Sequence, residues 1–183
     1  SKGRNMLASG GKLNKTGRHV LGGMQRHMAE ASICGAATVN AYRRRQPLSF
    51  CPVNASWGFD NRTVALRVVE GSDSAVRIEK RDAGADCNPY LMMAADIAAA
   101  LDGIAGKAEP TAATAGNAYE DHGAPPLPLD LASAISLARG SGWLCDVLGG
   151  DQYEIWLQQA ERELDFFWQQ VTPFETDRYL TTF

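Results

Sequence analysis

The segment Ala75–Arg81 alternates charged and apolar residues with the period of a β-strand. In an extended strand, Arg77, Glu79 and Arg81 all point to one face, and the intervening valine and isoleucine point to the other. A face that carries two arginines and a glutamate is unsuited to a hydrophobic core. The spacing therefore predicts a strand with one apolar and one charged face.

The upstream segment Asp60–Arg67 predicts a turn that enters a second strand. If the two segments pair as a hairpin, Arg62 and Arg67 join the same neighbourhood. Four guanidinium groups around one carboxylate are typical of a site for a highly anionic ligand, because arginine stays charged and its planar fork suits phosphate and carboxylate oxygens. A solvated sheet face with alternating charge is the alternative, and these residues alone do not separate the two interpretations.

Composition indicates a globular protein: the 183 residues are 45% hydrophobic and 21% charged. A net charge of −3 gives no reason to expect nucleic acid as a partner. No apolar run approaches the roughly 20 residues that cross a bilayer, and the first residues do not form a signal peptide. The four cysteines stand singly and predict free thiols in a reducing cytoplasm, and the isolated histidines predict surface or helix-face positions.

Hydrophobic periodicity predicts helices separated by one group of strands. Residues 1–17 indicate an irregular lead-in that Leu13 anchors, and residues 108–128, rich in proline and glycine, indicate a loop. Two or three strands are expected between Pro52 and Arg81. The aromatic stripe with Trp156 and Trp168 predicts core or subunit contact. The expected helices span 18–35, 88–106, 129–139, 143–148 and 153–170, with a last short one from Pro173.

Six short segments follow one another along the chain: Thr38-Val-Asn-Ala-Tyr-Arg-Arg44, Pro52-Val-Asn-Ala-Ser-Trp-Gly58, Asp60-Asn-Arg-Thr63, Arg77-Ile-Glu-Lys-Arg81, Asn88-Pro-Tyr-Leu91 and Ala99-Ala-Leu-Asp-Gly-Ile104. In this order they resemble motifs of the C-terminal half of the glutamine synthetase catalytic domain. The ending Val171–Leu180 is also similar to that of glutamine synthetase relatives. Each segment alone would be weak evidence, but six in register identify the resemblance.

The resemblance implies an α+β fold in which an antiparallel sheet, part of a half-barrel, is backed by helices and followed by a helical C-terminal region. Residues 1–183 would form the C-terminal portion of the catalytic domain, without the N-terminal β-grasp domain or the upstream catalytic strands. The chain alone is then expected to be inactive. The intact protein would be a homo-oligomer, because family members assemble as double rings, commonly dodecamers.

The chemistry that the resemblance implies is ATP-dependent amide formation. ATP phosphorylates the γ-carboxylate of glutamate, and ammonia or an amine displaces phosphate from the acyl phosphate. Negative charge gathers on the transferring group, and arginines together with Mg²⁺ or Mn²⁺ would stabilise it.

For the nucleotide half, the resemblance matches Arg62 to the arginine on the transferring phosphate and Arg67 to the one that holds ATP phosphates. It matches Arg77 to the arginine near the nucleotide's phosphate and base, and Glu79 to a metal ligand. One carboxylate cannot hold several metal ions, because hard divalent ions need several oxygen ligands.

For the glutamate half, Arg81 matches the arginine that faces the γ-carboxylate, and Arg44 matches the one that binds the α-carboxylate. The neighbouring Arg43 and Arg45 are expected in solvent or in a subunit contact.

Phe50 departs from the glutamine synthetase pattern. It occupies the place of a flap glutamate that helps to deprotonate ammonium, and a phenyl ring cannot accept a proton. At this position the sequence is similar to the γ-glutamyl ligases that join glutamate to polyamines or methylamine. The departure therefore favours an organic amine as acceptor.

Three further interpretations stay open at this point. The intact protein could be an ammonia-using glutamine synthetase or a catalytically dead homologue kept for assembly or regulation. An unrelated binding module with a charged sheet face would require the six matches to be coincidental.

Overall fold

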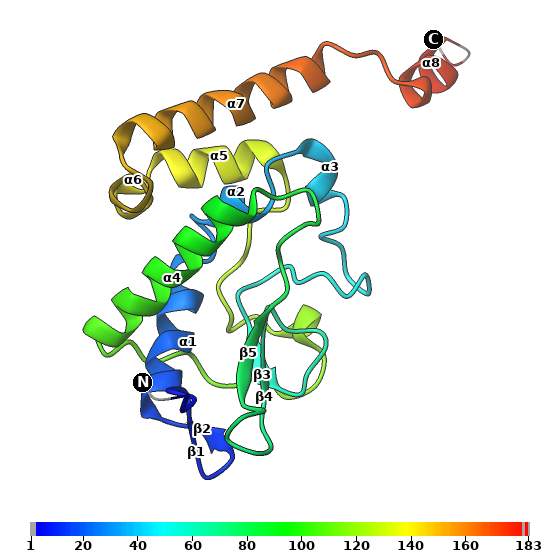
Figure 1. Cartoon of the computed structure of the whole chain (residues 1–183). Helices are drawn as coiled ribbons and strands as arrows, with labels where there is room; N and C mark the ends of the chain where they lie inside the picture. The colour runs from blue at the N-terminus through cyan, green and yellow to red at the C-terminus, as the bar shows by residue number, and fades with distance from the viewer. Residues whose placement is uncertain (1–2, 181, 183) are drawn as a thin grey trace.

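The computed structural model describes residues 3–180 and Thr182, and it has the expected α+β class. A three-stranded sheet lies beside two long helices, α1 (Lys15–His27) and α4 (Pro89–Ala105), and the helices of the C-terminal third stack at one end (Figure 1). In the described part of the chain, no helix is both long and apolar enough to cross a membrane.

The sheet consists of β3 (Trp57–Phe59), β4 (Leu66–Val69) and β5 (Arg77–Lys80), in that order. β4 and β5 form the antiparallel hairpin that the alternation predicted, and Arg67 lies directly opposite Glu79. Opposite residues of a ladder share a face, as do residues two apart on one strand. Arg67, Arg77 and Glu79 are therefore on one side of the sheet.

The expectation of a purely antiparallel sheet is wrong for β3, which pairs with β4 in parallel. Parallel pairs normally need a crossover of a dozen or more residues. Here β3 is only three residues long, so residues 60–65 are enough to return the chain. Asp60 adopts a left-handed φ of 46°, and the Asn61 side chain donates to Gly116 O at 2.7 Å, which holds this turn on a distant loop.

The N-terminal segment is more ordered than expected. It forms a small hairpin of β1 (Ala8–Ser9) and β2 (Lys12–Leu13), and Leu13 packs against the core between α1 and the sheet, as predicted. The single helix expected over 18–35 is divided into α1 and the short α2 (Ser32–Gly35). The break lies between His27 and Ser32, and the Ser32 hydroxyl spans it by donating to Met28 O at 3.0 Å.

α4 begins where the sequence predicted. The Asn88 side chain accepts hydrogen bonds from the backbone N–H groups of Tyr90 and Leu91, and Pro89 occupies the first turn. The helix crosses α1 at a glycine contact, because a Cβ on Gly103 would meet His19 O and the backbone of Gly23. This close approach confirms that the small residues of α4 serve tight packing.

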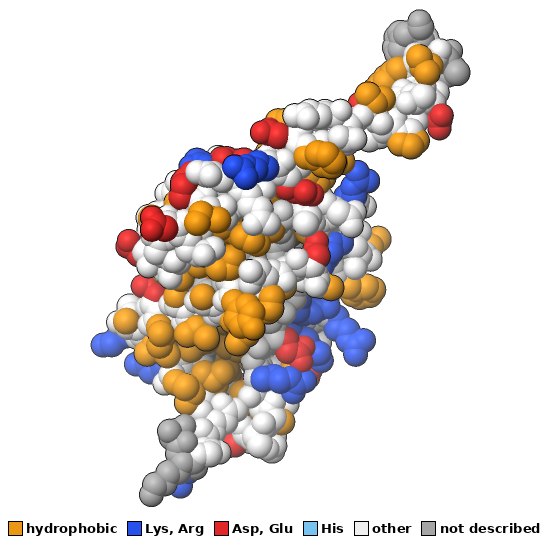
Figure 2. All heavy atoms as spheres, turned by 45° about the horizontal axis from the view of Figure 1, so that its top comes forward, with side chains coloured by type: hydrophobic (Ala, Val, Ile, Leu, Met, Phe, Trp, Pro, Cys, Tyr) orange, Lys and Arg blue, Asp and Glu red, His pale blue; other side chains and the backbone are white. Residues whose placement is uncertain are grey.

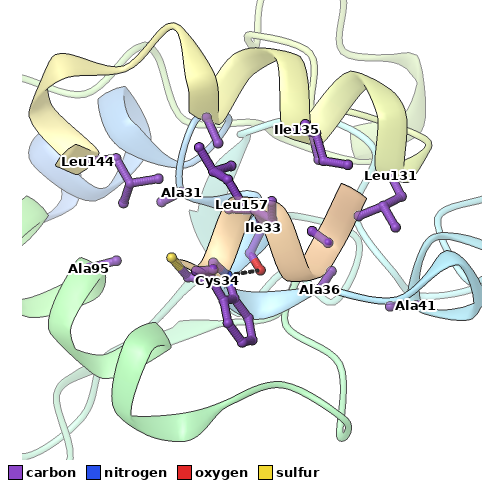
Figure 3. Close-up of a cluster of buried hydrophobic side chains, with 14 of the residues drawn as sticks. Ala31, Ile33, Cys34, Ala36, Ala41, Ala95, Leu131, Ile135, Leu144 and Leu157 are labelled. Atoms are coloured by element: carbon purple, nitrogen blue, oxygen red, sulfur yellow. Dashed lines mark hydrogen bonds between the residues drawn. The ribbon is translucent and has the colours of Figure 1, made fainter. Parts of the chain in front are cut away.

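The C-terminal helices enclose a second core with α2 and α3 (Val39–Tyr42). Figure 3 shows Ile33, Leu144 and Leu157 converging there from separate segments, each with no more than 1% exposure. The Trp156 indole donates to Ile33 O at 3.3 Å, whereas Trp168 is exposed. The helices concerned are α5 (Leu131–Arg139), α6 (Gly142–Leu148) and α7 (Gly150–Trp168).

The segment 108–128 is the expected loop, with one 3-10 turn, η1 (Ala118–Glu120). It runs along the sheet, where Thr114 N donates to Trp57 O at 2.8 Å. The last helix, α8 (Pro173–Tyr179), starts at the predicted Thr172 cap and extends away from the rest of the molecule (Figure 1).

Candidate functional site

The charged face of the β4–β5 hairpin carries a cluster of two arginines around one carboxylate. Glu79 Oε2 accepts from Arg67 Nη1 at 3.0 Å, and Glu79 Oε1 accepts from Arg77 Nε at 2.8 Å. Arg67 also donates to Asp60 Oδ1 at 2.7 Å. The sequence identified Arg67, Arg77 and Glu79 but missed Asp60, which precedes the predicted strand and belongs to the turn.

This pairing changes the protonation of the cluster. Partial burial raises the pKa of Glu79, but the hydrogen bonds from Arg77 and Arg67 outweigh it, so the pKa lies below its ordinary value. The hydrogen bond to Asp60, followed by that to Glu79, raises the pKa of Arg67 against the effect of desolvation. At neutral pH the cluster therefore combines one ionised carboxylate with two permanent cations.

Of the four predicted guanidinium groups, those of Arg67 and Arg77 bond to Glu79 in the described part of the chain. Arg81 lies just beyond β5, and its guanidinium donates to the carbonyls of Arg62 and Val64, and to Phe50 O at 3.5 Å. Arg62 lies in the turn before β4 and is exposed, and within residues 3–180 its side chain has no ion-pair partner. Arg81 continues the alternation, and its backbone N–H donates to Ala65 O at 3.0 Å, but carbonyls of the turn before β4 accept from its guanidinium. Arg62 lies in that turn, outside the paired strands.

Arg44 contacts the segment that begins at Arg81. Its Nη1 donates to Ala83 O at 2.9 Å, and its Nη2 reaches Arg81 O at 3.4 Å and Asp82 O at 3.5 Å. A guanidinium has five N–H donors, so these bonds orient the group and leave donors for a ligand. Arg44 and Arg81 are thus joined through the backbone of residues 81–83.

Phe50 belongs to an exposed loop that borders Arg81. Leu48 and Phe50 both adopt left-handed φ angles, 66° and 59°, and the Phe50 side chain is 62% exposed. The Tyr119 hydroxyl holds the end of this loop by donating to Cys51 O at 3.1 Å. The phenyl ring is therefore presented to solvent, and the backbone carbonyl of Phe50 accepts a hydrogen bond from the Arg81 guanidinium.

The expectation for Arg45 is wrong, whereas Arg43 is exposed as predicted. The Arg45 side chain is fully buried, lies 3.7 Å from Asp82 Oδ2 and stacks over the Tyr42 ring. A sequence signal existed: continued alternation from Arg77, Glu79 and Arg81 places Lys80 and Asp82 on the core-facing side of the strand. Charged side chains on the core-facing side, such as Lys80 and Asp82, require buried partners of opposite charge.

The carboxylates in this region do not complete a metal site by themselves. Among residues 3–180 and 182, no group of three or more His, Cys, Asp or Glu side chains is arranged to hold an ion. Both Glu79 oxygens already accept from arginines. Mg²⁺ and Mn²⁺ prefer several oxygen ligands, so Glu79 can supply one ligand but not a site.

The candidate residues thus fall into two neighbouring groups. Arg67, Arg77 and Glu79 form a salt-bridged face on β4 and β5, suited to a polyanion. Arg44 and Arg81 are joined through residues 81–83 beside the Phe50 loop, where guanidinium groups suit carboxylates. Figure 2 shows Lys and Arg side chains gathered on one side of the molecule, next to a hydrophobic area.

Comparison with known proteins identifies the same family that the motifs indicated. Residues 1–179 match the family described as glutamine synthetase, catalytic domain. The chain is 39% identical over 176 residues to the gamma-glutamylethanolamide synthetase GlnA4 of Streptomyces coelicolor, and 33% identical over 175 residues to the glutamine synthetase of Thermotoga maritima. These matches cover 96% and 92% of this chain but only 38% and 40% of the relatives.

A solved structure agrees with the sequence relatives. The structure described as apo GmaS without ligand superimposes with a TM-score of 0.82 and 30% identity. It matches 95% of this chain, which in turn covers 40% of that protein. On the ordered motifs, the match of residues 1–179 to the catalytic-domain family and this common fold, the chain belongs to the glutamine synthetase family.

Proposed function

We propose that this chain is the C-terminal portion of the catalytic domain of an ATP-dependent glutamate–amine ligase. One observation carries the proposal: in a member of the glutamine synthetase family, a salt-bridged arginine face lies next to a second pair of arginines, Arg44 and Arg81. The first face suits phosphates and the second suits carboxylates. A ligase that phosphorylates a carboxylate needs a phosphate-binding site and a carboxylate-binding site next to each other.

The proposed reaction has two steps. A γ-carboxylate oxygen of glutamate attacks the γ-phosphorus of ATP, the bond to ADP breaks, and γ-glutamyl phosphate forms. The amine nitrogen then attacks the acyl carbon, phosphate leaves with the electron pair of its bond, and the nitrogen loses a proton to give the γ-glutamyl amide. Each step moves negative charge onto oxygens that fixed cations can stabilise.

In the nucleotide half, we assign Arg67 and Arg77 to the ATP phosphates. Glu79 would contribute one ligand to Mg²⁺ or Mn²⁺, with the remaining ligands supplied by polypeptide outside this chain. A divalent ion bound there would neutralise phosphate charge. The exposed side chain of Arg62, whose backbone carbonyl bonds to Arg81, is assigned to the transferring phosphoryl group.

In the glutamate half, we assign Arg44 to the α-carboxylate and Arg81 to the γ-carboxylate. Their contacts with backbone carbonyls hold both guanidinium groups in place before the ligand binds, which lowers the entropic cost of binding. This preorganisation supports a role for both arginines in orienting glutamate.

Phe50 supports an organic amine as acceptor. An exposed phenyl ring, on a residue whose carbonyl bonds to Arg81, offers apolar surface to an alkyl chain and no base for ammonium. The relatives include both kinds of enzyme, one named for an ethanolamide product and one named glutamine synthetase. Phe50 is the residue on which the choice depends.

We also propose that the intact protein is a homo-oligomer of the double-ring type. Exposed hydrophobic side chains on α4 and α8 support this assembly, because large apolar patches in water are usually covered. They are Tyr90, Met93, Ile97, Leu101, Phe174 and Tyr179.

Phosphate release by the full-length protein tests the proposed function. The assay would contain ATP, glutamate and, in turn, ammonium, methylamine, ethanolamine and putrescine. We expect release that depends on glutamate and is faster with at least one alkylamine than with ammonium. Faster turnover with ammonium than with every alkylamine would refute the assignment of Phe50, and no glutamate-dependent release would refute the ligase.

A further inference from the structure

The core-facing side of β5 carries a buried charge cluster that the proposed reaction does not use. Arg45 Nη2 and Asp82 Oδ2 lie 3.7 Å apart, and both side chains have 0% exposure. Lys80 Nζ lies 3.7 Å from Asp82 Oδ1 and 2.7 Å from Asp96 Oδ1 on α4. Two cations and two carboxylates thus neutralise one another inside the fold.

Arg45 fixes this cluster to a second part of the chain. Its Nη1 donates to Pro128 O at 2.7 Å and to Ser32 Oγ at 3.3 Å, and its guanidinium covers the Tyr42 ring at 4.8 Å. A buried carboxylate is costly to maintain unless a cation compensates it. Neither Asp82 oxygen has a hydrogen-bond partner in the described part of the chain, so Arg45 and Lys80 compensate this carboxylate by charge, each at 3.7 Å. Arg45 is itself held by the hydrogen bonds of its Nη1 to Pro128 and Ser32.

Asp82 also belongs to the segment that links the two arginines assigned to glutamate. Its neighbour Arg81 points toward Phe50, while Arg44 donates to the carbonyls of Arg81, Asp82 and Ala83. The consecutive residues Arg44 and Arg45 both contact the segment 81–83. Arg44 bonds to the backbone carbonyls of this segment, and Arg45 forms an ion pair with the Asp82 carboxylate. A shift of residues 81–83 would move both glutamate-binding guanidinium groups at once.

The nucleotide half is attached differently. Arg67 and Glu79 are paired in the β4–β5 ladder, and Arg77 lies two residues before Glu79 on the same strand. Backbone ladder bonds and their own salt bridges hold these side chains without Asp82. Loss of the Arg45–Asp82 pair should therefore affect the glutamate half of the site more than the nucleotide half.

We propose that Arg45 and Asp82 are positioning residues that set the geometry of Arg44 and Arg81 for glutamate, an inference that rests on the proposed ligase function. Displacing a binding group by about 1 Å can cost up to about 100-fold in rate or affinity. The pair touches no substrate; it acts only by holding the segment 81–83 between the loop that follows α3 and the sheet.

The test compares steady-state KM values for glutamate and ATP in the full-length protein and its variants. Asp82→Asn leaves Arg45 buried without its charge partner and is expected to lower stability. The double variant Arg45→Met/Asp82→Ala removes both charges, and replacing a buried ion pair by apolar groups is often tolerated. Arg45→Lys keeps a cation and provides a milder variant that should fold, while losing the planar fork.

A matched control is Asp102→Asn on α4, which removes the ion-pair partner of His27 and Arg26 away from the segment 81–83. Thermal unfolding of every variant is measured beside the kinetics. We expect the double variant and Arg45→Lys to raise the glutamate KM about tenfold, with the ATP KM within twofold of native. The control should change the melting temperature and leave both KM values within twofold.

Each outcome decides a separate question. A folded double variant and a folded Arg45→Lys variant with native glutamate KM overturn the positioning role and leave the ligase function standing. Equal rises in both KM values also overturn it, because they indicate a general loss of structure. If the native protein neither turns over nor binds glutamate in calorimetry, the ligase function is refuted, and the positioning role is refuted with it.

Discussion

Glu79→Gln separates the structural and functional contributions of the charged face. Glu79 is the acceptor for both Arg67 and Arg77, and its side chain is 31% exposed. Partly exposed ion pairs contribute roughly 0.2–1 kcal/mol each, so losing two should lower the free energy of unfolding by about 1 kcal/mol. Against the typical 5–15 kcal/mol of a folded protein, such a loss leaves nearly all molecules folded.

The expected loss of activity is much larger. If Glu79 contributes a metal ligand and aligns two phosphate-binding arginines, its neutralisation removes charge that the transition state needs. Loss of one such electrostatic group commonly lowers kcat by about 10²–10³-fold. Urea unfolding gives the stability change, and ATP- and glutamate-dependent phosphate release by the full-length protein gives the activity.

Asp60→Asn is the matched control for this variant. Asp60 also pairs with Arg67, but its side chain is 69% exposed and no catalytic role is assigned to it. We expect a similar or smaller stability change and activity within threefold of native. The reasoning would be refuted if Glu79→Gln kept activity within threefold of native, or if both variants lost activity equally.

Predictions at Gly103, Cys34 and Phe50 test the fold and the acceptor site. Gly103→Ala should lower the free energy of unfolding by about 1–3 kcal/mol, because the added Cβ meets backbone of α1, whereas Gly142→Ala, with open space around it, should have little effect. Burial raises the pKa of the Cys34 thiol from 9.0 to about 12, so native protein at pH 8 should be alkylated at the partly exposed Cys87 and Cys145 before Cys34, as mass spectrometry would show. Since the pKa of Cys34 is raised in the folded state, its contribution to the free energy of unfolding is intact below pH 9 and declines as the pH rises toward 12. A free energy of unfolding that does not change across that pH window would contradict the burial of Cys34. Phe50→Glu should lower kcat/KM for alkylamines relative to ammonium by about tenfold or more, and an unchanged ratio would exclude Phe50 from the acceptor site.

The charged hairpin was predictable because its pattern is local. Alternation along residues 75–81 determines which side chains share a face, and the antiparallel pairing of β4 with β5 follows from a short connection. The helix starts at Asn88 and Thr172 were predictable for the same reason, since their side chains cap the first turn of their own helices.

Long-range contacts account for the errors. The parallel pairing of β3 depends on a turn held by Gly116, more than 50 residues away in the chain. Arg45 resembles its exposed neighbour Arg43 in sequence, but Asp82 and Pro128 surround it in the fold. Arg81 continues the alternation, yet carbonyls from the turn and the Phe50 loop direct its guanidinium away from Glu79.

The ATP KM of an Arg67→Gln variant of the full-length protein tests most directly whether the β4–β5 face binds a nucleotide. Loss of a charge-assisted hydrogen bond commonly costs about 1.5–3 kcal/mol, or roughly 10- to 150-fold. We predict an ATP KM at least tenfold above native, with the glutamate KM within twofold. A folded variant with a native ATP KM would contradict the proposal that this face holds ATP.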